Sequence, residues 1–175
     1  MTVLAEYEEG WAAQYAAVAE QLTAVFGDTV TEVEHIGSTA VPGLVAKPVI
    51  DIAARAVSLR VASGKDRQLA ALGFQHEPAG PPGRRTYTKT QGGVLTSNLH
   101  IFPAEVWDTL NQRILRDHLR ATPEAVRRYS ELKRRLATEG LTGFDYTTAK
   151  TTLIQELTDD ARRLRGLPSV PVWET

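Results

Sequence analysis

Apolar residues near the start of the chain recur at helical spacing. Consecutive members lie three or four positions apart, which places all of them on one side of a helix. These residues are Trp11, Tyr15, Val18, Leu22 and Phe26. Because Gly27 follows the last of them, the pattern predicts an N-terminal helix that ends there.

Stretches rich in β-branched residues predict the strands. Residues 29–36 alternate loosely, and residues 49–54 are almost wholly apolar, as expected of a strand that is buried on both faces. A helix is predicted over 61–72. Residues 84–90 and 94–102 are then expected to pair as a hairpin across a Gly-Gly turn.

Helical periodicity returns in the second half of the chain. The predicted helices cover residues 104–120, 123–139 and 145–165. We therefore expect one α/β or α+β domain over 1–166, in which a small mixed sheet from residues 1–103 carries a C-terminal helical cluster from residues 104–166. Residues 167–175 are expected to form an extended tail.

Composition narrows the class of protein. The 175 residues are 42% hydrophobic and 23% charged, which is typical of a globular domain. The chain has no cysteine, which excludes disulfides and thiolate zinc sites. The net charge of −1 argues against binding to nucleic acid or to an anionic membrane. With no apolar run long enough to span a bilayer and no signal-peptide pattern, we expect a cytoplasmic protein.

Charged residues continue the apolar stripes of the three C-terminal helices. Lys133 lies near the middle of one stripe, Lys150 continues another one turn after Tyr146, and Asp117 extends the third. Burying a lone ammonium costs several kcal/mol or more, so these side chains either reach water at their tips or converge on a polar pocket. Three helices with the same pattern favour the pocket. Arginines off the stripes, such as Arg162, are expected on a solvated face.

A second polar signal follows the first predicted strand. A Gly-Ser step, Gly37–Ser38, lets the backbone approach a phosphate closely. Asp51 stands in an otherwise apolar strand, where a carboxylate needs a metal or a cation as partner. Together they indicate a metal–nucleotide site, and the alternative is an ordinary turn beside one structural aspartate.

The sequence HIGSTAVPGLVAKPVIDI at residues 35–52 closely resembles the hallmark of the GrpB family, a branch of the nucleotidyltransferase superfamily with a polymerase-β-like fold. The resemblance continues, in order, over nearly the whole chain. Its further segments are PGRRTYTK at 82–89, NLHIF at 98–102, RDHLRATPEAVRRYSELKRRLA at 116–137 and YTTAKTTLIQEL at 146–157.

The resemblance implies roles for the two polar signals. Gly37–Ser38 match the element that holds nucleotide phosphates, and Asp51 matches the first carboxylate of an Asp-x-Asp/Glu metal pair. The second carboxylate is missing, because position 53 is Ala53. A later strand offers Asn98 and His100 on one face. We therefore predict Mg²⁺ or another divalent metal on Asp51 and His100, although Mg²⁺ prefers oxygen ligands, which puts a two-metal mechanism in question.

Further residues are candidates for contact with substrate or phosphate. They are His35, Lys47, Arg84, Arg85, Tyr87, Arg116 and Tyr146. Arg85 and Tyr87 share one strand face and Arg84 takes the other. An arginine that faces the pocket would grip a phosphate in a fork. The alternatives are a surface hairpin for the arginines, a capped strand end for His35 and solvent contact for Lys47.

Three functions follow from these residues. The first is transfer of a nucleotidyl or phosphoryl group from a nucleotide to a small acceptor. In this function Lys133, Lys150 and an arginine near position 84 or 116 neutralise charge at phosphorus, and Asp117 either orients a cation or acts as a base. The second is a non-catalytic module that binds a nucleotide or another anionic small molecule and has lost the metal pair, as Ala53 indicates. A nucleic-acid or scaffold protein is third, and the absence of an aromatic and basic stripe argues against it.

Overall fold

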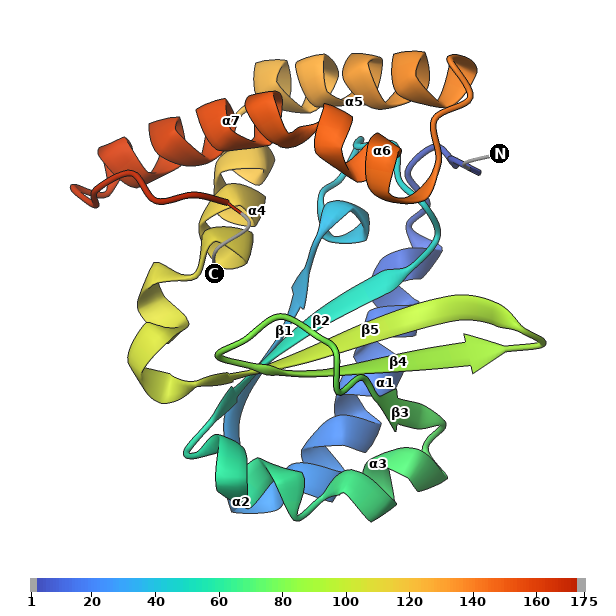
Figure 1. The fold of residues 1–175 in the computed structure, drawn as a ribbon, viewed down its shortest axis with the longest axis vertical. Helices are drawn as coiled ribbons and strands as arrows, with labels where there is room; N and C mark the ends of the chain where they lie inside the picture. The colour runs from blue at the N-terminus through green and yellow to red at the C-terminus, as the bar shows by residue number, and fades with distance from the viewer. Residues whose placement is uncertain (1–2, 173–175) are drawn as a thin grey trace.

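The centre of the molecule is a five-stranded mixed β-sheet. The computed structural model describes residues 3–172. Its sheet has the strand order β1-β2-β5-β4-β3, with β2 and β5 parallel and every other neighbouring pair antiparallel (Figure 1). The strands are β1 (Val30–Ile36), β2 (Ile50–Ala56), β3 (Phe74–His76), β4 (Arg85–Gln91) and β5 (Val94–Pro103).

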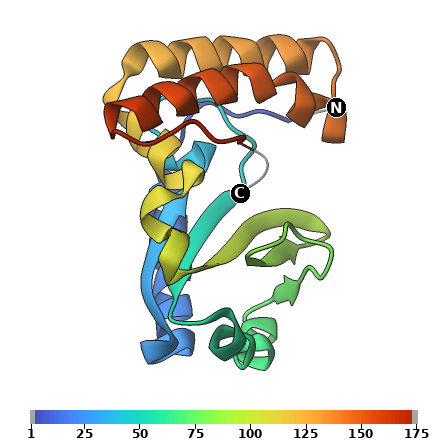
Figure 2. The ribbon, with the colours of Figure 1, turned by 60° about the vertical axis from the view of Figure 1, so that its left-hand side comes forward.

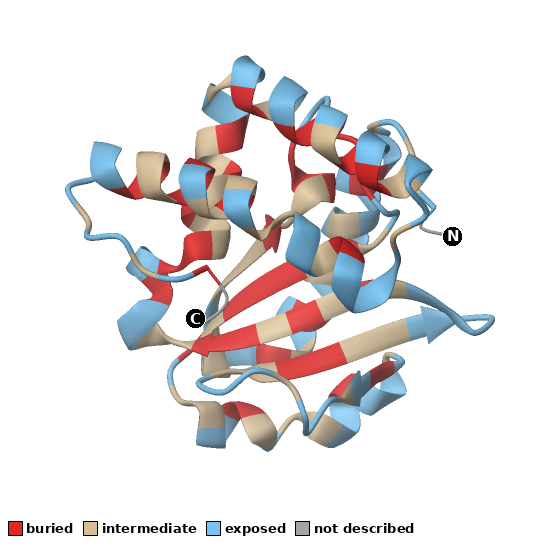
Figure 3. Ribbon diagram, turned by 45° about the horizontal axis from the view of Figure 1, so that its top comes forward, coloured by how far each residue is buried: buried red, intermediate tan, exposed pale blue. Residues whose placement is uncertain are grey.

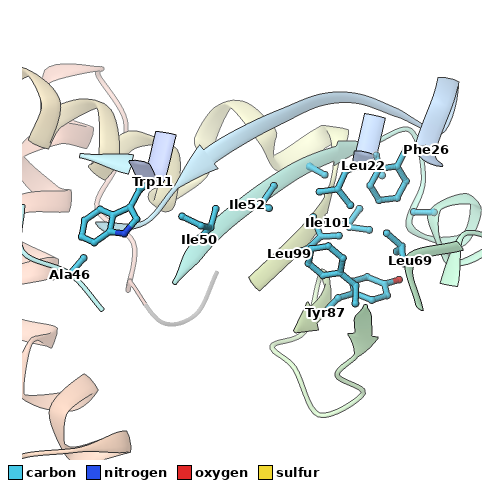
Figure 4. Close-up of a cluster of buried hydrophobic side chains, with 14 residues drawn as sticks. Trp11, Leu22, Phe26, Ala46, Ile50, Ile52, Leu69, Tyr87, Leu99 and Ile101 are labelled. Carbon is cyan, nitrogen blue, oxygen red and sulfur yellow. The ribbon is translucent and has the colours of Figure 1, made fainter. Parts of the chain in front are cut away.

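Three helices cover one face of the sheet. They are α1 (Gly10–Phe26), α2 (Leu59–Ser63) and α3 (Asp66–Ala71). The main hydrophobic core lies between them and the sheet, where Leu22 and Phe26 meet Ile52, Leu99 and Tyr87 (Figure 4). Since side chains alternate along a strand, the residues between these strand positions face the other way.

The helical half lies across one end of the sheet (Figures 1 and 2). It begins with a 3-10 segment, η3 (Ala104–Thr109), and its helices are α4 (Asn111–Ala121), α5 (Pro123–Thr138), α6 (Gly143–Ala149) and α7 (Thr151–Leu164). A second core joins α4, α5 and α7 to the loop after β1, with Leu119, Tyr129 and Leu157 packed on Val41 and Leu44. Buried residues line the inward sides of these helices (Figure 3).

The mixed sheet with a C-terminal helical cluster confirms the predicted fold class. The predicted N-terminal helix, the first two strands and the hairpin are also confirmed, and Gln91 pairs with Val94 across the Gly-Gly turn. No helix within residues 3–172 combines the length and the apolar character that a membrane span requires.

Three predicted helices are divided in the structure. The stretch 61–72 forms α2 and α3 around Gly64, so that Ala62 and Leu69 both reach the main core. The stretch 104–120 is divided by Leu110, which has the extended angles φ −61° and ψ 121°. Lys150 separates α6 from α7. The short edge strand β3 was not predicted, because three residues carry too little periodicity to show it.

The C-terminal segment turns back along α7. Gln155 Nε2 donates to the Val170 carbonyl over 3.0 Å, and Val172 N donates to Gln155 Oε1 over 3.0 Å. The Arg162 guanidinium donates to the Pro168 carbonyl over 2.5 Å. The remainder of the predicted extended tail, residues 173–175, lies outside the described residues.

Candidate functional site

A cavity of about 350 Å³ lies between the sheet and the helical half. Its sheet side is formed by the end of β1 and by Gly37, Ser38, Asp51, Arg84 and His100. Its other side comes from α4, α5, α7 and the C-terminal segment. The cavity therefore opens on the sheet face that α1, α2 and α3 leave uncovered.

The Gly37–Ser38 step lies directly against Asp51, because Ile36 and Asp51 are partners in the antiparallel β1–β2 pair. Gly37 has a φ of +71°, which glycine adopts readily and other residues do not. A Cβ at this position would lie 2.3 Å from Asp51 Oδ2. Glycine is thus required here both by the backbone angle and by the neighbouring carboxylate.

Asp51 is held in place from the next strand. The parallel register pairs it with Asn98, and Asn98 Nδ2 donates to Asp51 Oδ1 over 2.8 Å. Burial raises the pKa of Asp51 to about 6, while the Asn98 hydrogen bond and the charges of Lys133 and Lys150 act in the opposite direction. The structure therefore brings Asp51 near both predicted lysines.

Lys133 is buried, with 3% of its surface exposed. Its Nζ donates to Ser38 Oγ over 2.6 Å and to the Val45 carbonyl over 2.9 Å, and it lies 4.2 Å from the centre of the Tyr129 ring. Burial and the charge of Lys150 hold its pKa well below the usual value. Among residues 3–172, no carboxylate lies within 4.0 Å of this ammonium.

A second cationic group adjoins the first. Lys150 Nζ lies 4.4 Å from the centre of the buried Tyr146 ring, and Lys47 Nζ lies 4.8 Å from the same ring. Burial and the charge of Lys47 lower the pKa of Lys150 to about 8. Three of the predicted residues, Lys47, Tyr146 and Lys150, are thus neighbours, and Asp51 feels the charge of Lys150.

Arg84 and His100 complete the sheet side of the cavity. The Arg84 guanidinium lies 5.3 Å from the Phe102 ring centre, and burial lowers its pKa. Burial and the charge of Arg84 lower the pKa of His100 to about 4. His100 Nδ1 lies 3.4 Å from Thr86 Oγ1. His100 is therefore a neutral ring beside a cation.

The side chains around Asp51 do not match the donor set that Mg²⁺ prefers. The strand position that would supply a second carboxylate is Ala53, which is buried and pairs with His100. Within residues 3–172 no group of three or more His, Asp or Glu side chains is placed to hold a metal ion. Arg84, Lys133 and Lys150 make the surroundings positive, which suits an anion better than a divalent cation.

Three predicted residues lie on the opposite side of the sheet, because they alternate with the cavity-facing positions. Tyr87 is in the main core, and its hydroxyl donates to Asp66 Oδ1 over 2.7 Å. Arg85 pairs with Asp66 over 2.7 Å. His35 stacks on the Tyr15 ring of α1 at 4.7 Å. The structure does not bring Arg85, Tyr87 or His35 to the cavity.

Arg116 and Asp117 bind mainly to other charged groups. Arg116 lines the cavity, but its guanidinium donates to Glu34 over 2.6 Å, to the His35 carbonyl over 2.9 Å and to Asp117 over 2.7 Å. Burial tends to raise the pKa of Asp117, but hydrogen bonds from Arg116 and Arg165 lower it overall. A carboxylate stabilised in this way is a poor base, and Asp117 does not line the cavity.

Several residues on the helical side of the cavity were not predicted from the sequence. Asn111, Gln112 and Thr158 line it, and Arg162, expected on a solvated face, is 4% exposed and donates to Asn111 Oδ1 over 2.8 Å. The sequence signal that could have revealed them is Thr158, a polar residue that lies four positions after Ile154 and therefore on the apolar stripe of α7. Arg162 lies four residues later on the same side of α7.

Comparison with protein families and sequences agrees with the motifs. The family described as GrpB protein matches residues 2–160. The UPF0157 protein YqkA of Bacillus subtilis is 30% identical over 158 residues, which are 90% of this chain and 46% of that protein. The UPF0157 protein SCO7215 of Streptomyces coelicolor is 31% identical over 152 residues, which are 86% of this chain and 79% of that protein. The chain thus spans less than half the length of YqkA.

Comparison with solved structures finds a member of the same family and more distant proteins that share the fold. A conserved GrpB protein from Enterococcus faecalis has a TM-score of 0.86 at 26% identity, covering 94% of this chain and 99% of that one. Terminal uridylyl transferase 4 from Trypanosoma brucei, solved with dUTP, has a TM-score of 0.57 at 14% identity, covering 95% of this chain and 57% of that one. The chain therefore belongs to the GrpB family and has the nucleotidyltransferase fold.

Proposed function

We propose that this protein binds the phosphate group of a nucleotide, or of another phosphorylated small molecule, between Gly37–Ser38 and the lysines, and that the lysines take the place of a metal ion. The observation that carries the proposal is the buried Lys133 ammonium, which has no carboxylate within 4.0 Å in the described part of the chain. Two of its N–H groups are used by Ser38 and Val45. A buried cation without a counter-ion is costly, and a bound anion removes that cost.

The proposal is tested by isothermal titration calorimetry with nucleoside triphosphates, pyrophosphate and inorganic phosphate. Binding is expected in EDTA and is expected to change little when Mg²⁺ is added. Lys133→Met, which keeps the length of the side chain and removes the charge, should weaken binding at least about tenfold. Lys65→Met, in the turn between α2 and α3, is the matched control and should bind as the unchanged protein does. No heat with any of these compounds would refute the proposal.

Proton uptake gives an independent check. Burial holds the pKa of Lys133 well below its usual value, and an adjacent phosphate would raise it again. Binding should therefore take up protons at any pH at which the free Lys133 amine is partly deprotonated, which calorimetry over a series of pH values in buffers of different ionisation enthalpy measures. The uptake should be smaller in Lys133→Met.

A second candidate function is transfer of a nucleotidyl or phosphoryl group to a small acceptor. The specific observation in its favour is the position of Asp51, which faces the cavity beside Gly37 and has a pKa of about 6 as a result of burial. A carboxylate with that pKa accepts a proton from an acceptor hydroxyl near neutral pH. The lysines would stabilise charge that develops at phosphorus.

Transfer is tested by following release of phosphate or pyrophosphate from nucleoside triphosphates in the presence of small hydroxyl compounds. Asp51→Asn keeps the shape of the side chain and should abolish turnover while nucleotide binding remains. Equal turnover by Asp51→Asn would contradict the role of Asp51. Turnover and binding that both require Mg²⁺ would contradict the replacement of the metal by lysines.

A further inference from the structure

Three polar atoms on the helical side of the cavity have no hydrogen-bond partner among residues 3–172. They are Asn111 Nδ2, Gln112 Oε1 and Thr158 Oγ1, and each is buried. All three residues line the same cavity as Gly37, Ser38 and Asp51. We call Asn111, Gln112 and Thr158 the α4–α7 wall. Buried polar groups are nearly always satisfied, so three unsatisfied ones in residues that line one cavity point to a ligand.

The orientation of Asn111 is fixed by its neighbour. Arg162 Nη1 donates to Asn111 Oδ1 over 2.8 Å and to the Thr109 carbonyl over 3.0 Å. Because a guanidinium only donates, the amide oxygen must face Arg162 and the Nδ2 group is left as a donor without a partner. Arg162 is itself held by the Pro168 carbonyl, so the donor is presented on a rigid support.

The Thr158 hydroxyl is buried in an apolar environment, where an unpaired hydroxyl is energetically costly. Its residue has 0% exposed surface, and apolar side chains of Leu115, Leu119 and Ile154 line the cavity nearby. Valine would fill the same volume without an unpaired hydroxyl. A polar atom retained in such a position is explained by a bond to a bound molecule.

We propose that the α4–α7 wall binds an uncharged planar group that carries a hydrogen-bond donor and an acceptor side by side, as the edge of a nucleobase or a carboxamide does. The inference rests on the proposed function, because the same cavity reaches Gly37–Ser38. The wall offers both a donor, Asn111 Nδ2, and an acceptor, Gln112 Oε1. The two arginines of the helical side are already engaged, Arg162 by Asn111 Oδ1 and the Thr109 carbonyl, and Arg116 by Glu34 and Asp117. A cavity of about 350 Å³ is within the range of small-molecule sites.

The first test compares ligands on the unchanged protein. Uridine and guanosine 5′-monophosphates are measured against ribose 5-phosphate, which has the same phosphate and sugar without a base. At least about tenfold tighter binding of the base-bearing compounds is expected from two or more added hydrogen bonds. Nicotinamide mononucleotide is a further arm. If nicotinamide mononucleotide is the one compound that binds more tightly than ribose 5-phosphate, the bound group is a carboxamide. Equal affinity of all four compounds overturns the inference.

The second test uses two variants that keep the shape of the wall. Thr158→Val removes the hydroxyl, and Asn111→Asp keeps the acceptor for Arg162 but replaces the donor. Each should weaken the preferred base- or carboxamide-bearing compound about three- to tenfold and leave ribose 5-phosphate unchanged. Thr158→Val should also raise the Tm, which rules out loss of folding as the cause. Thr152→Val, exposed on the same helix, is the control. Unchanged affinity in both wall variants overturns the inference.

Failure of this inference is distinguishable from failure of the phosphate proposal. If ribose 5-phosphate binds and depends on Lys133 but the base adds nothing, only the inference fails. If no phosphate compound binds while free uridine or guanosine does and depends on Thr158, the phosphate proposal fails and the α4–α7 wall retains its assigned role.

Discussion

Gly37 joins two constraints at one residue. Its φ of +71° is unfavourable for other residues, and a Cβ would meet Asp51 Oδ2 at 2.3 Å. A clash of this size displaces a carboxylate that Asn98 holds near the start of β2. The residue therefore sets the geometry of the strand end as well as that of the turn.

Gly37→Ala should lower the free energy of unfolding by more than about 2 kcal/mol and abolish phosphate binding, because strain in the left-handed region alone costs about 1–2 kcal/mol. Denaturant titration and calorimetry measure the two effects. Gly83→Ala is the control, since Gly83 has a φ of +76° but open space around its Cβ position. An equal loss of stability in both variants would contradict the role assigned to the Asp51 contact.

Two histidines make the stability dependent on pH. Burial and nearby arginines lower the pKa of His35 and of His100 from 6.5 to about 4. Their contribution is complete above pH 6.5 and is lost as the pH falls toward 4, because the unfolded chain takes up the protons first. Asp51 acts in the opposite direction, since its pKa is raised to about 6 and its contribution is lost as the pH rises through that value.

In His100→Gln the fall in the free energy of unfolding between pH 6.5 and 4 should be shallower than in the unchanged protein, because one of the two protonation sites is removed. Urea titration at a series of pH values measures the slope. A slope that does not change would contradict the neutral state assigned to His100.

Among the elements, β1 and α4 are joined by charged side chains. Glu34 accepts from Arg113 Nη2 over 2.8 Å and from Arg116 Nη1 over 2.6 Å, with 23% of its side chain exposed. Burial tends to raise the pKa of Glu34, but hydrogen bonds from both arginines lower it overall. These contacts fix α4, and with it Asn111 and Gln112, against the end of the sheet.

Glu34→Gln should lower the free energy of unfolding by about 1–3 kcal/mol, because two partly buried guanidinium groups lose their charged acceptor. Glu6→Gln is the comparison, since Glu6 meets Arg134 on the surface with 75% of its side chain exposed. Its change should be less than about 1 kcal/mol. Chemical denaturation measures both, and equal losses would argue against a structural role for Glu34.

The same elements show how far the sequence alone was informative. Periodicity predicted α1, and runs of β-branched and apolar residues predicted β2 and the hairpin. The polar positions on apolar helix stripes indicated that Lys133 and Lys150 point toward the protein interior. The alternation rule separated Arg84 from Arg85 and Tyr87, but it could not tell which face of the hairpin α1, α2 and α3 leave uncovered, because that depends on packing between distant segments. Arg162 was misplaced for the same reason: its partners, Thr109 and Asn111, come from another part of the chain.

At the scale of the whole molecule, the segment after α7 closes one side of the cavity. Val172 is 7% exposed and lines the cavity. Gln155 Oε1 accepts from Val172 N, and Gln155 Nε2 donates to the Val170 carbonyl. The predicted extended tail is therefore, as far as Val172, a packed part of the structure.

Gln155→Ala should release this segment and lower the free energy of unfolding by about 1–2 kcal/mol, from the loss of two hydrogen bonds. Amide hydrogen exchange at Val172 should become faster, while exchange in β2 and β5 should keep its protection. Thr152→Val, on the exposed side of the same helix, should change neither quantity. Slow exchange at Val172 in Gln155→Ala would show that other contacts hold the segment.

The hydrogen bond from Lys133 to Ser38 joins residues that are 95 positions apart. Because closing so long a loop costs entropy, we expect Lys133 and Ser38 to meet only after the strands and the helical cluster have come together. A phosphate compound bound between them, as proposed, would then recognise only the assembled chain. The bound compound would slow unfolding and leave the rate of folding nearly unchanged. It would therefore stabilise the native state kinetically, through the unfolding rate.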